Sequence, residues 1–183
     1  MTGVEPSRMN RIAVIGCSGS GKSTLSRQLG ERLNIPVIHL DRVFWQPGWV
    51  EPPRDEFAAN VRKAVAGERW ILDGNFGNTQ HIVLPAADTI IWLDFPRRIC
   101  MGRIIKRLLT YFGRTRPDLP GGCPEKVDFV FLEYVWNFQN DTRPRIMSRL
   151  AQRRADQTLV ILRNPADVTR FRREMGIFVR DDA

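Results

Sequence analysis

The sequence is poor in the residues that bind zinc or form disulfides. Its 183 residues include three cysteines, at positions 17, 100 and 123, and two histidines. Because the cysteines form no CxxC pair, neither a zinc cluster nor a disulfide framework is expected. No apolar run approaches the roughly 18 residues of a transmembrane helix, and residues 1–11 lack the apolar segment of a secretory signal. We therefore expect a cytoplasmic protein with no membrane partner.

The sequence also lacks internal repeats and low-complexity linkers, so we expect one domain over residues 1–183. Hydrophobic residues make up 43% and charged residues 26%, a composition that is ordinary for globular proteins and excludes global disorder. The formal net charge is +8 at pH 7. A basic balance favours anionic partners such as nucleotides or nucleic acid, although a basic solvated surface gives the same balance.

Short β-rich runs alternate with helical stretches, a pattern that predicts an α/β sheet with crossover helices. The predicted strands are 11–15, 36–40, 70–73, 89–93 and 158–162, and the predicted helices are 22–33, 54–66, 96–109, 126–140 and 165–175. The strands are apolar without strict alternation, as expected where helices cover both faces of the sheet. Helix 126–140 is apolar on nearly all sides, so we expect it to be buried. The long segments 41–53 and 110–124 are interpreted as functional or flexible excursions.

Residues 16–23 read GCSGSGKS and fit the phosphate-binding pattern G-x-x-x-x-G-K-[ST] between a predicted strand and a predicted helix. Glycines let the chain curl so that backbone N–H groups form an anion-binding nest beside the positive end of the helix dipole. A glycine-rich turn is the structural alternative. The residues predicted to bind ATP phosphates are Gly16, Ser18, Gly19, Ser20, Gly21, Lys22, Ser23 and Thr24. Lys22 would neutralise phosphate charge, and Ser23 would offer its hydroxyl to Mg²⁺.

Three aspartates, Asp41, Asp73 and Asp94, follow predicted strands. Ligands of doubly wound sheets bind at the carboxyl ends of strands, and Mg²⁺ takes oxygen ligands. Asp73 is the best candidate to hold the metal with Ser23. Asp41 is a candidate catalytic residue that binds the acceptor or acts as general base on its hydroxyl. Each aspartate could instead serve as a turn or helix-cap residue, and we favour that alternative for Asp94.

A basic stretch from residue 95 to residue 117 contains seven Arg or Lys and no acid. Arg103 and Arg107 are four residues apart and share one helix face. Arginines suit bidentate phosphate recognition and can stabilise transition-state charge, so Lys22, Arg103 and Arg107 are predicted to be catalytic. A solvated basic face is the alternative. Further arginines at 114, 116, 143, 145 and 149 either close over the phosphates or lie on the surface.

Taken in order, these motifs resemble the adenylate-kinase-like group of P-loop nucleoside and small-molecule kinases. The matching segments are the loop at 16–23, the strand and turn at 70–74, the strand and proline at 87–96, the Arg103/Arg107 pair and the segment 162–165. His39-Leu40-Asp41, followed by aromatic residues, is most similar to a bacterial subset named DNA topology modulation proteins. Trp45 and Trp49 either stack on an acceptor ring or pack under the loop.

The resemblance implies a three-layer P-loop fold with five parallel strands in the order 2-3-1-4-5. It also implies an acceptor-binding insertion at about 41–69 and an arginine-rich lid at about 110–145. Arg103 would lie near the adenine or phosphates, Arg107 on the transferred phosphoryl group and Arg163 in the adenine-contacting loop.

The implied activity is Mg²⁺-dependent transfer of the ATP γ-phosphoryl group to a nucleotide or small molecule. The family's Asp-Gly-Phe-Pro-Arg is replaced here by Asp73-Gly74-Asn75-Phe76-Gly77. AMP is therefore not the expected acceptor, because the arginine that clamps its phosphate is missing. The alternative function is a nucleotide-gated, DNA-binding topology regulator without kinase activity, although no DNA-binding motif is recognisable.

Overall fold

The computed structural model describes residues 8–75, 77–115 and 119–178. The strands are β1 (Arg11–Gly16), β2 (Val37–His39), β3 (Trp70–Asp73), β4 (Thr89–Leu93) and β5 (Thr158–Leu162). The helices are α1 (Lys22–Leu33), α2 (Leu40–Phe44), α3 (Arg54–Ala64), α4 (Gln80–Ala86), α5 (Arg97–Tyr111), α6 (Phe129–Asp141), α7 (Arg143–Ala151) and α8 (Pro165–Glu174).

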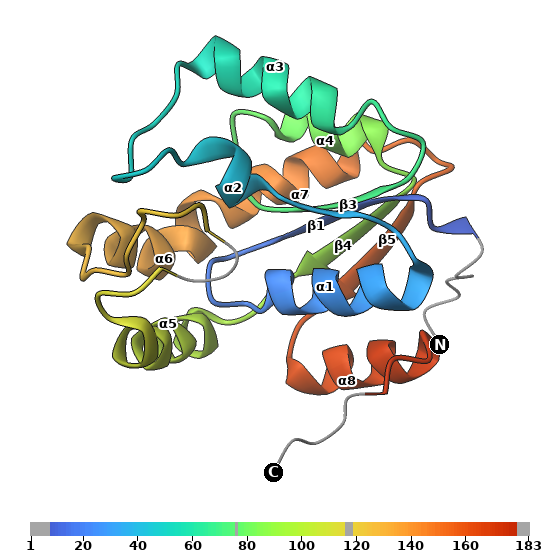
Figure 1. Ribbon diagram of the computed structural model, residues 1–183. Helices are drawn as coiled ribbons and strands as arrows, with labels where there is room; N and C mark the ends of the chain where they lie inside the picture. Colours follow the sequence, from blue (N-terminus) through green and yellow to red (C-terminus); the bar gives the residue numbers. More distant parts are fainter. Residues whose placement is uncertain (1–7, 76, 116–118, 179–183) are drawn as a thin grey trace.

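The strands form one parallel sheet in the order β2-β3-β1-β4-β5, so the predicted α/β fold class and strand order are confirmed. Helices α1 and α8 lie on one side of the sheet, and α3, α4 and α7 lie on the other (Figure 1). Helices α5 and α6 lie beyond the carboxyl ends of the strands (Figure 1). Because parallel strands end at the same edge, the loops that follow β1, β2 and β3 converge there.

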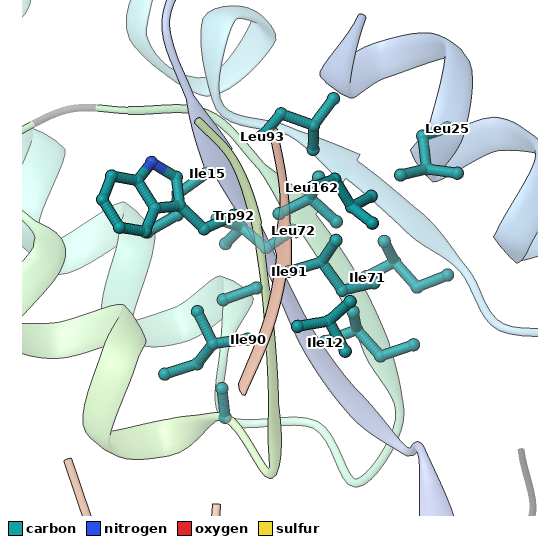
Figure 2. Close-up of a cluster of buried hydrophobic side chains, with 14 of the residues drawn as sticks. Ile12, Ile15, Leu25, Ile71, Leu72, Ile90, Ile91, Trp92, Leu93 and Leu162 are labelled. Carbon is teal, nitrogen blue, oxygen red and sulfur yellow. The ribbon is translucent and has the colours of Figure 1, made fainter. Parts of the chain in front are cut away.

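The core consists of apolar side chains from the central strands and the helices that cover them. Figure 2 shows Ile12, Ile71 and Ile91 from three neighbouring strands packed together, with Leu25 of α1 beside them. Every residue of β3 and β4 is buried. Burying such a side chain stabilises the fold by about 1.5–3 kcal/mol, so the sheet is a rigid support for the loops at its carboxyl edge.

The predicted bounds of β3, β4 and β5 are confirmed, but strand β2 ends one residue earlier than predicted. Leu40 is the first residue of α2, and its side chain is buried. A Cβ at Gly74 would lie 2.6 Å from the Cβ of Leu40. The chain therefore turns at residue 40 so that Leu40 can pack directly on the backbone that leaves β3.

Three short helices, α2, α4 and α7, were not predicted. Helices α2 and α4 are only 5 and 7 residues long, too short to show a helical period, and α4 contains Pro85. Helix α7 is rich in arginine. In α7 the buried residues are Ile146 and Leu150, four positions apart. A helix of nine residues that buries such a narrow face owes its stability to tertiary packing and gives only a weak sequence signal.

The prediction that helix 126–140 is buried on all sides is wrong. Helix α6 packs against α5 and α7 and buries Val135 and Phe138. Phe129 and Val130 are 80% and 78% exposed. The helix lies at the end of the sheet and not within a layer (Figure 1), so one side has no protein to cover it. Among the residues that the structure describes, no helix combines the length and apolar character needed to cross a membrane.

The two excursions from the sheet are tied to each other. Gly48 N–H donates to the Gly122 carbonyl at 2.9 Å, and Trp49 Nε1 donates to the Pro124 carbonyl at 3.0 Å. Trp45 packs edge-on against Trp49, with their ring centroids 5.1 Å apart. The two tryptophans therefore pack against each other in the structure.

Candidate active site

The glycine-rich loop joins the end of β1 to the start of α1 at the carboxyl edge of the sheet. Gly16, Gly19 and Gly21 have φ angles of 146°, 78° and 99°, which strongly favour glycine. Gly21 is the N-cap of α1, and no side-chain bond caps this end of the helix. The first N–H groups of α1 are therefore available to an anion.

Two cationic side chains lie against this loop. Lys22 Nζ donates to the Cys17 carbonyl at 3.0 Å. Arg103 of α5 donates from Nη1 to the Ser20 carbonyl at 2.8 Å and lies over the Phe95 ring. The structure thus brings Lys22 and Arg103 to the loop that the sequence predicts to bind phosphate, and their charges reinforce the positive end of α1.

Cys17 and Cys100 join the same loop to α5 through a hydrogen bond between their thiols. This bond and burial raise the pKa of Cys17 above its ordinary value. Both cysteines are free and buried, so Cys17 stays a neutral packing residue.

We expect Gly19→Ala to destabilise the protein, because the loop lies in direct contact with α5. A Cβ at Gly19 would lie 2.4 Å from the Cys100 carbonyl oxygen and 3.0 Å from Ile104 Cγ1. The clash and the positive φ together should lower the free energy of unfolding by about 2–5 kcal/mol. Thermal unfolding should show a midpoint that is lower by roughly 4 °C or more.

Gly102→Ala is the matched control for this substitution. Gly102 lies in α5, and a Cβ there would meet no atom within 4 Å. Alanine favours a helix interior over glycine by roughly 0.5–1 kcal/mol, so this variant should be as stable as the parent or slightly more so. Equal midpoints for the two variants would contradict the tight contact between the loop and α5.

Asp73 ends β3 beside the glycine-rich loop and has one carboxylate oxygen without a partner. Val14, two residues before Gly16, pairs with Asp73 across the β1–β3 ladder. Asp73 is buried, and Oδ1 lies 2.8 Å from His39 Nδ1. Oδ2 is buried and has no hydrogen-bond partner among the described residues. A buried unpaired oxygen is unfavourable unless a ligand or water satisfies it.

Asp73 and Ser23 can hold a hard cation only together with oxygens from phosphate or water. No group of three His, Cys, Asp or Glu that could hold a metal occurs in the described ranges. Mg²⁺ commonly takes one or two protein oxygens, with phosphate and water completing its shell. Asp73 Oδ2 and the half-buried Ser23 are suited to that kind of site. The role of His39 as the partner of Asp73 was missed by the sequence analysis.

Asp41 does not follow the end of a strand directly, as predicted, but lies in the first turn of α2. It is half-buried, and its charge acts on the Tyr134 hydroxyl of α6. Burial, with smaller contributions from Cys17 and Asp41, raises the pKa of Tyr134. Asn75 Nδ2 donates to this hydroxyl at 3.4 Å. This hydrogen bond joins α6 to the segment that follows β3.

The structure corrects the helix-cap interpretation of Asp94. The N-cap of α5 is Pro96. Asp94 instead accepts from Arg143, with Nε at 2.9 Å from Oδ1 and Nη2 at 2.9 Å from Oδ2. The same hydrogen bonds raise the pKa of Arg143. This bidentate pair anchors the start of α7 to the end of β4.

The other predicted arginines have different surroundings. Arg107 Nε lies 3.2 Å from Oε1 of the buried Glu125, and its guanidinium lies over the Phe131 ring. The Arg163 side chain is exposed and makes no hydrogen bond or ion pair within the described part of the chain. Arg114 is also exposed. Arg116 lies outside the described residues.

Arg172 of α8 was missed by the sequence analysis. Burial and the charge of Arg103 lower the pKa of Arg172. Like charges that lie close together favour a shared anion. Helix α8 carries Arg170, Arg172 and Arg173 in one short stretch, and nothing in the sequence distinguishes the arginine that lies near Arg103.

Comparison with known proteins relates the fold to small-molecule kinases. No family model and no curated protein matches the sequence. The solved shikimate kinase from Acinetobacter baumannii, in complex with shikimate, is 12% identical, with a TM-score of 0.57, and the match covers 94% of this chain and 96% of that chain. The shikimate kinase from Bacteroides thetaiotaomicron is 15% identical, with a TM-score of 0.54 and coverage of 92% and 99%. The chain therefore has a P-loop kinase-like fold.

Proposed function

We propose that the protein is a kinase that transfers the γ-phosphoryl group of Mg²⁺-bound ATP to a nucleotide or small-molecule acceptor. The observation that carries the proposal is the glycine-rich loop, curled at the start of α1 with Lys22 and Arg103 against it. Structural neighbours named shikimate kinase support a phosphotransferase. A triphosphate has the charge and shape that this arrangement of N–H groups and cations favours.

Phosphoryl transfer depends mainly on position and charge. An acceptor oxygen forms a bond to the γ-phosphorus as the bond to the β,γ-bridging oxygen breaks, and ADP leaves with that oxygen. In this proposal Asp41 takes the proton of the acceptor hydroxyl. Lys22, Arg103 and Arg107 stabilise the charge on the transferred group. Residues 16–24 hold the phosphates, and Arg163 adjoins the adenine.

Ser23 and Asp73 are the proposed protein ligands of Mg²⁺, the latter through a water molecule. Mg²⁺, when bound, would neutralise charge on the β- and γ-phosphate oxygens. His39 holds one oxygen of Asp73, and this contact orients the other oxygen toward the proposed site. Hydrogen bonds from a neighbouring side chain to a metal ligand set the position of that ligand.

In this proposal residues 1–183 form one kinase-like domain, with the acceptor insertion at about 41–69 and the lid at about 110–145. The hydrogen bonds that join residues 46–49 to residues 122–124 support a shared cover over the site. A closed cover excludes water, which would otherwise compete with the acceptor for the phosphoryl group.

A phosphate-transfer screen tests the proposed function. Purified protein with Mg²⁺ and ATP is incubated with nucleosides, nucleotides, sugars or small acids, and ADP release and the phosphorylated product are measured. We expect one acceptor class to raise ADP release well above the acceptor-free rate. Failure to bind Mg²⁺–ATP, together with no acceptor-dependent ADP release, would contradict the proposal. The DNA-binding regulator stays an untested prediction, and discrimination between DNA sequences at physiological salt would favour it.

A further inference from the structure

A cavity of about 410 Å³ lies between the segment that follows β3 and helices α6 and α7. Its volume falls within the range of small-molecule sites. Asn75, Asn78 and Gln80 line it from one side, and Tyr134, Arg145 and Arg149 line it from the other. No described residue of its lining is acidic. The lining is therefore polar and carries two positive charges without a carboxylate.

A chain of hydrogen bonds fixes the polar side chains along this cavity. Arg149 Nη1 donates to Gln80 Oε1, and Gln80 Nε2 donates to Asn75 Oδ1 at 2.7 Å. Asn75 Nδ2 in turn donates to the Tyr134 hydroxyl at 3.4 Å. Gln80 is 4% exposed and uses both ends of its amide. The network connects α7 to α6 and sets the orientation of each amide, as in a built binding surface.

Arg145 is the charge in this cavity that the network leaves available. It lies on α7, one helical turn before Arg149. It makes no hydrogen bond or ion pair within the described ranges. Arg143 on the same helix is already held by Asp94. An available guanidinium beside an oriented one favours a planar oxyanion, because guanidinium N–H groups pair with carboxylate and phosphate oxygens.

We propose that this cavity binds the charged end of the phosphoryl acceptor, and that the acceptor is a small hydroxyl compound bearing a carboxylate or phosphate, recognised by Arg145. The inference rests on the proposed kinase function and names its substrate class. Tyr134 lines the cavity, and the charge of Asp41 acts on its hydroxyl. In this proposal the oxyanion of the acceptor meets Arg145, and its hydroxyl extends toward Asp41.

Inorganic phosphate is a suitable probe, because the two proposed anion sites can be separated by substitution. Phosphate binding is measured by ³¹P NMR in Lys22→Ala protein, in which the loop site is weakened. Adding Arg145→Ala should raise the phosphate dissociation constant about tenfold or more, the effect of losing a charge-assisted hydrogen bond. Arg27→Ala is the matched control, since Arg27 is an exposed arginine of α1. Equal phosphate affinities after the Arg145 and Arg27 substitutions would overturn the inference.

A second experiment compares charged and neutral small molecules to test the chemical class of the acceptor. Glycolate bears a carboxylate and a hydroxyl, and ethylene glycol is a neutral diol of similar size. In the Lys22→Ala protein we expect phosphate or glycolate to bind and ethylene glycol not to bind. If phosphate binds more tightly than glycolate, the acceptor is a phosphorylated compound; if glycolate binds more tightly, the acceptor is a carboxylic acid. Ethylene glycol that binds as tightly as both anions would overturn the oxyanion assignment. Anion binding that does not change after Arg145→Ala contradicts this inference alone, whereas unchanged ATP turnover after Lys22→Ala contradicts the proposed function.

Discussion

Lys22→Ala should lower ATP turnover by about 10²–10³-fold or more, the loss that follows removal of one charge-stabilising donor from a preorganised site. Lys22 is the first residue of α1, and its ammonium donates to the Cys17 carbonyl at 3.0 Å within the loop. Alanine keeps the backbone of the loop and has a high helix propensity. The substitution therefore removes charge without removing the cradle of N–H groups.

The measurement is ADP release at saturating Mg²⁺–ATP, paired with the thermal unfolding midpoint of each protein. Arg27→Ala is the control, because Arg27 is an exposed cationic residue of the same helix, α1. We expect both variants to unfold near the parent midpoint and only Lys22→Ala to lose turnover. Unchanged turnover in Lys22→Ala would remove the proposed phosphate site from the mechanism.

The parts of the fold that the sequence predicted correctly have local causes. The start of α1 at Lys22 follows from the glycines of the preceding loop and from Leu25 and Leu29 four residues apart. β3 and β4 are buried throughout, so continuous apolar runs marked their bounds. The sheet order itself was predicted from the ordered set of motifs, through the family resemblance that they carry.

The parts that the sequence did not predict depend on residues far apart in the chain. His39 meets Asp73 because β2 and β3 are neighbouring parallel strands that end at one edge of the sheet. Arg143 meets Asp94 because α7 begins beside the end of β4. Neither pair leaves a spacing pattern in the sequence. The exposed side of α6 was missed for a related reason. Apolar composition indicates burial only when another element covers the helix, and α6 lies at the end of the sheet.

The acceptor side of the site also depends on residues that lie far apart in the chain and leave no spacing pattern in the sequence. The sequence lacks an arginine after Asp73-Gly74, which argued against AMP as acceptor. In three dimensions, arginines of α7 face Asn75 and Gln80 across the cavity. Cationic side chains therefore reach this region from a helix some 70 residues later in the chain. Only the packing of α7 beside the segment after β3 reveals that proximity.

Arg107→Ala should lower turnover far more than it lowers ATP affinity. A guanidinium that stabilises the transferred phosphoryl group contributes about 10³-fold or more to the rate of phosphoryl transfer. The interaction would form mainly in the transition state, so ground-state binding of ATP should change little. The measurements are kcat for ADP release and the dissociation constant of Mg²⁺–ATP. Equal losses in both quantities would contradict a transition-state role.

Glu125→Gln separates that role from the contribution of Arg107 to packing. Arg107 and the buried Glu125 form an ion pair of 3.2 Å, so Arg107→Ala also removes this ion pair from the buried carboxylate, at a cost of about 1–3 kcal/mol. Glutamine removes the same charge pair, keeps the side-chain volume and retains Arg107. If Arg107 acts on the phosphoryl group, Glu125→Gln should keep kcat near the parent value or raise it, because the guanidinium is released from a competing carboxylate. A loss of kcat as large as that of Arg107→Ala would mean that the pair holds the lid segment in place and that Arg107 makes no separate contribution to transfer.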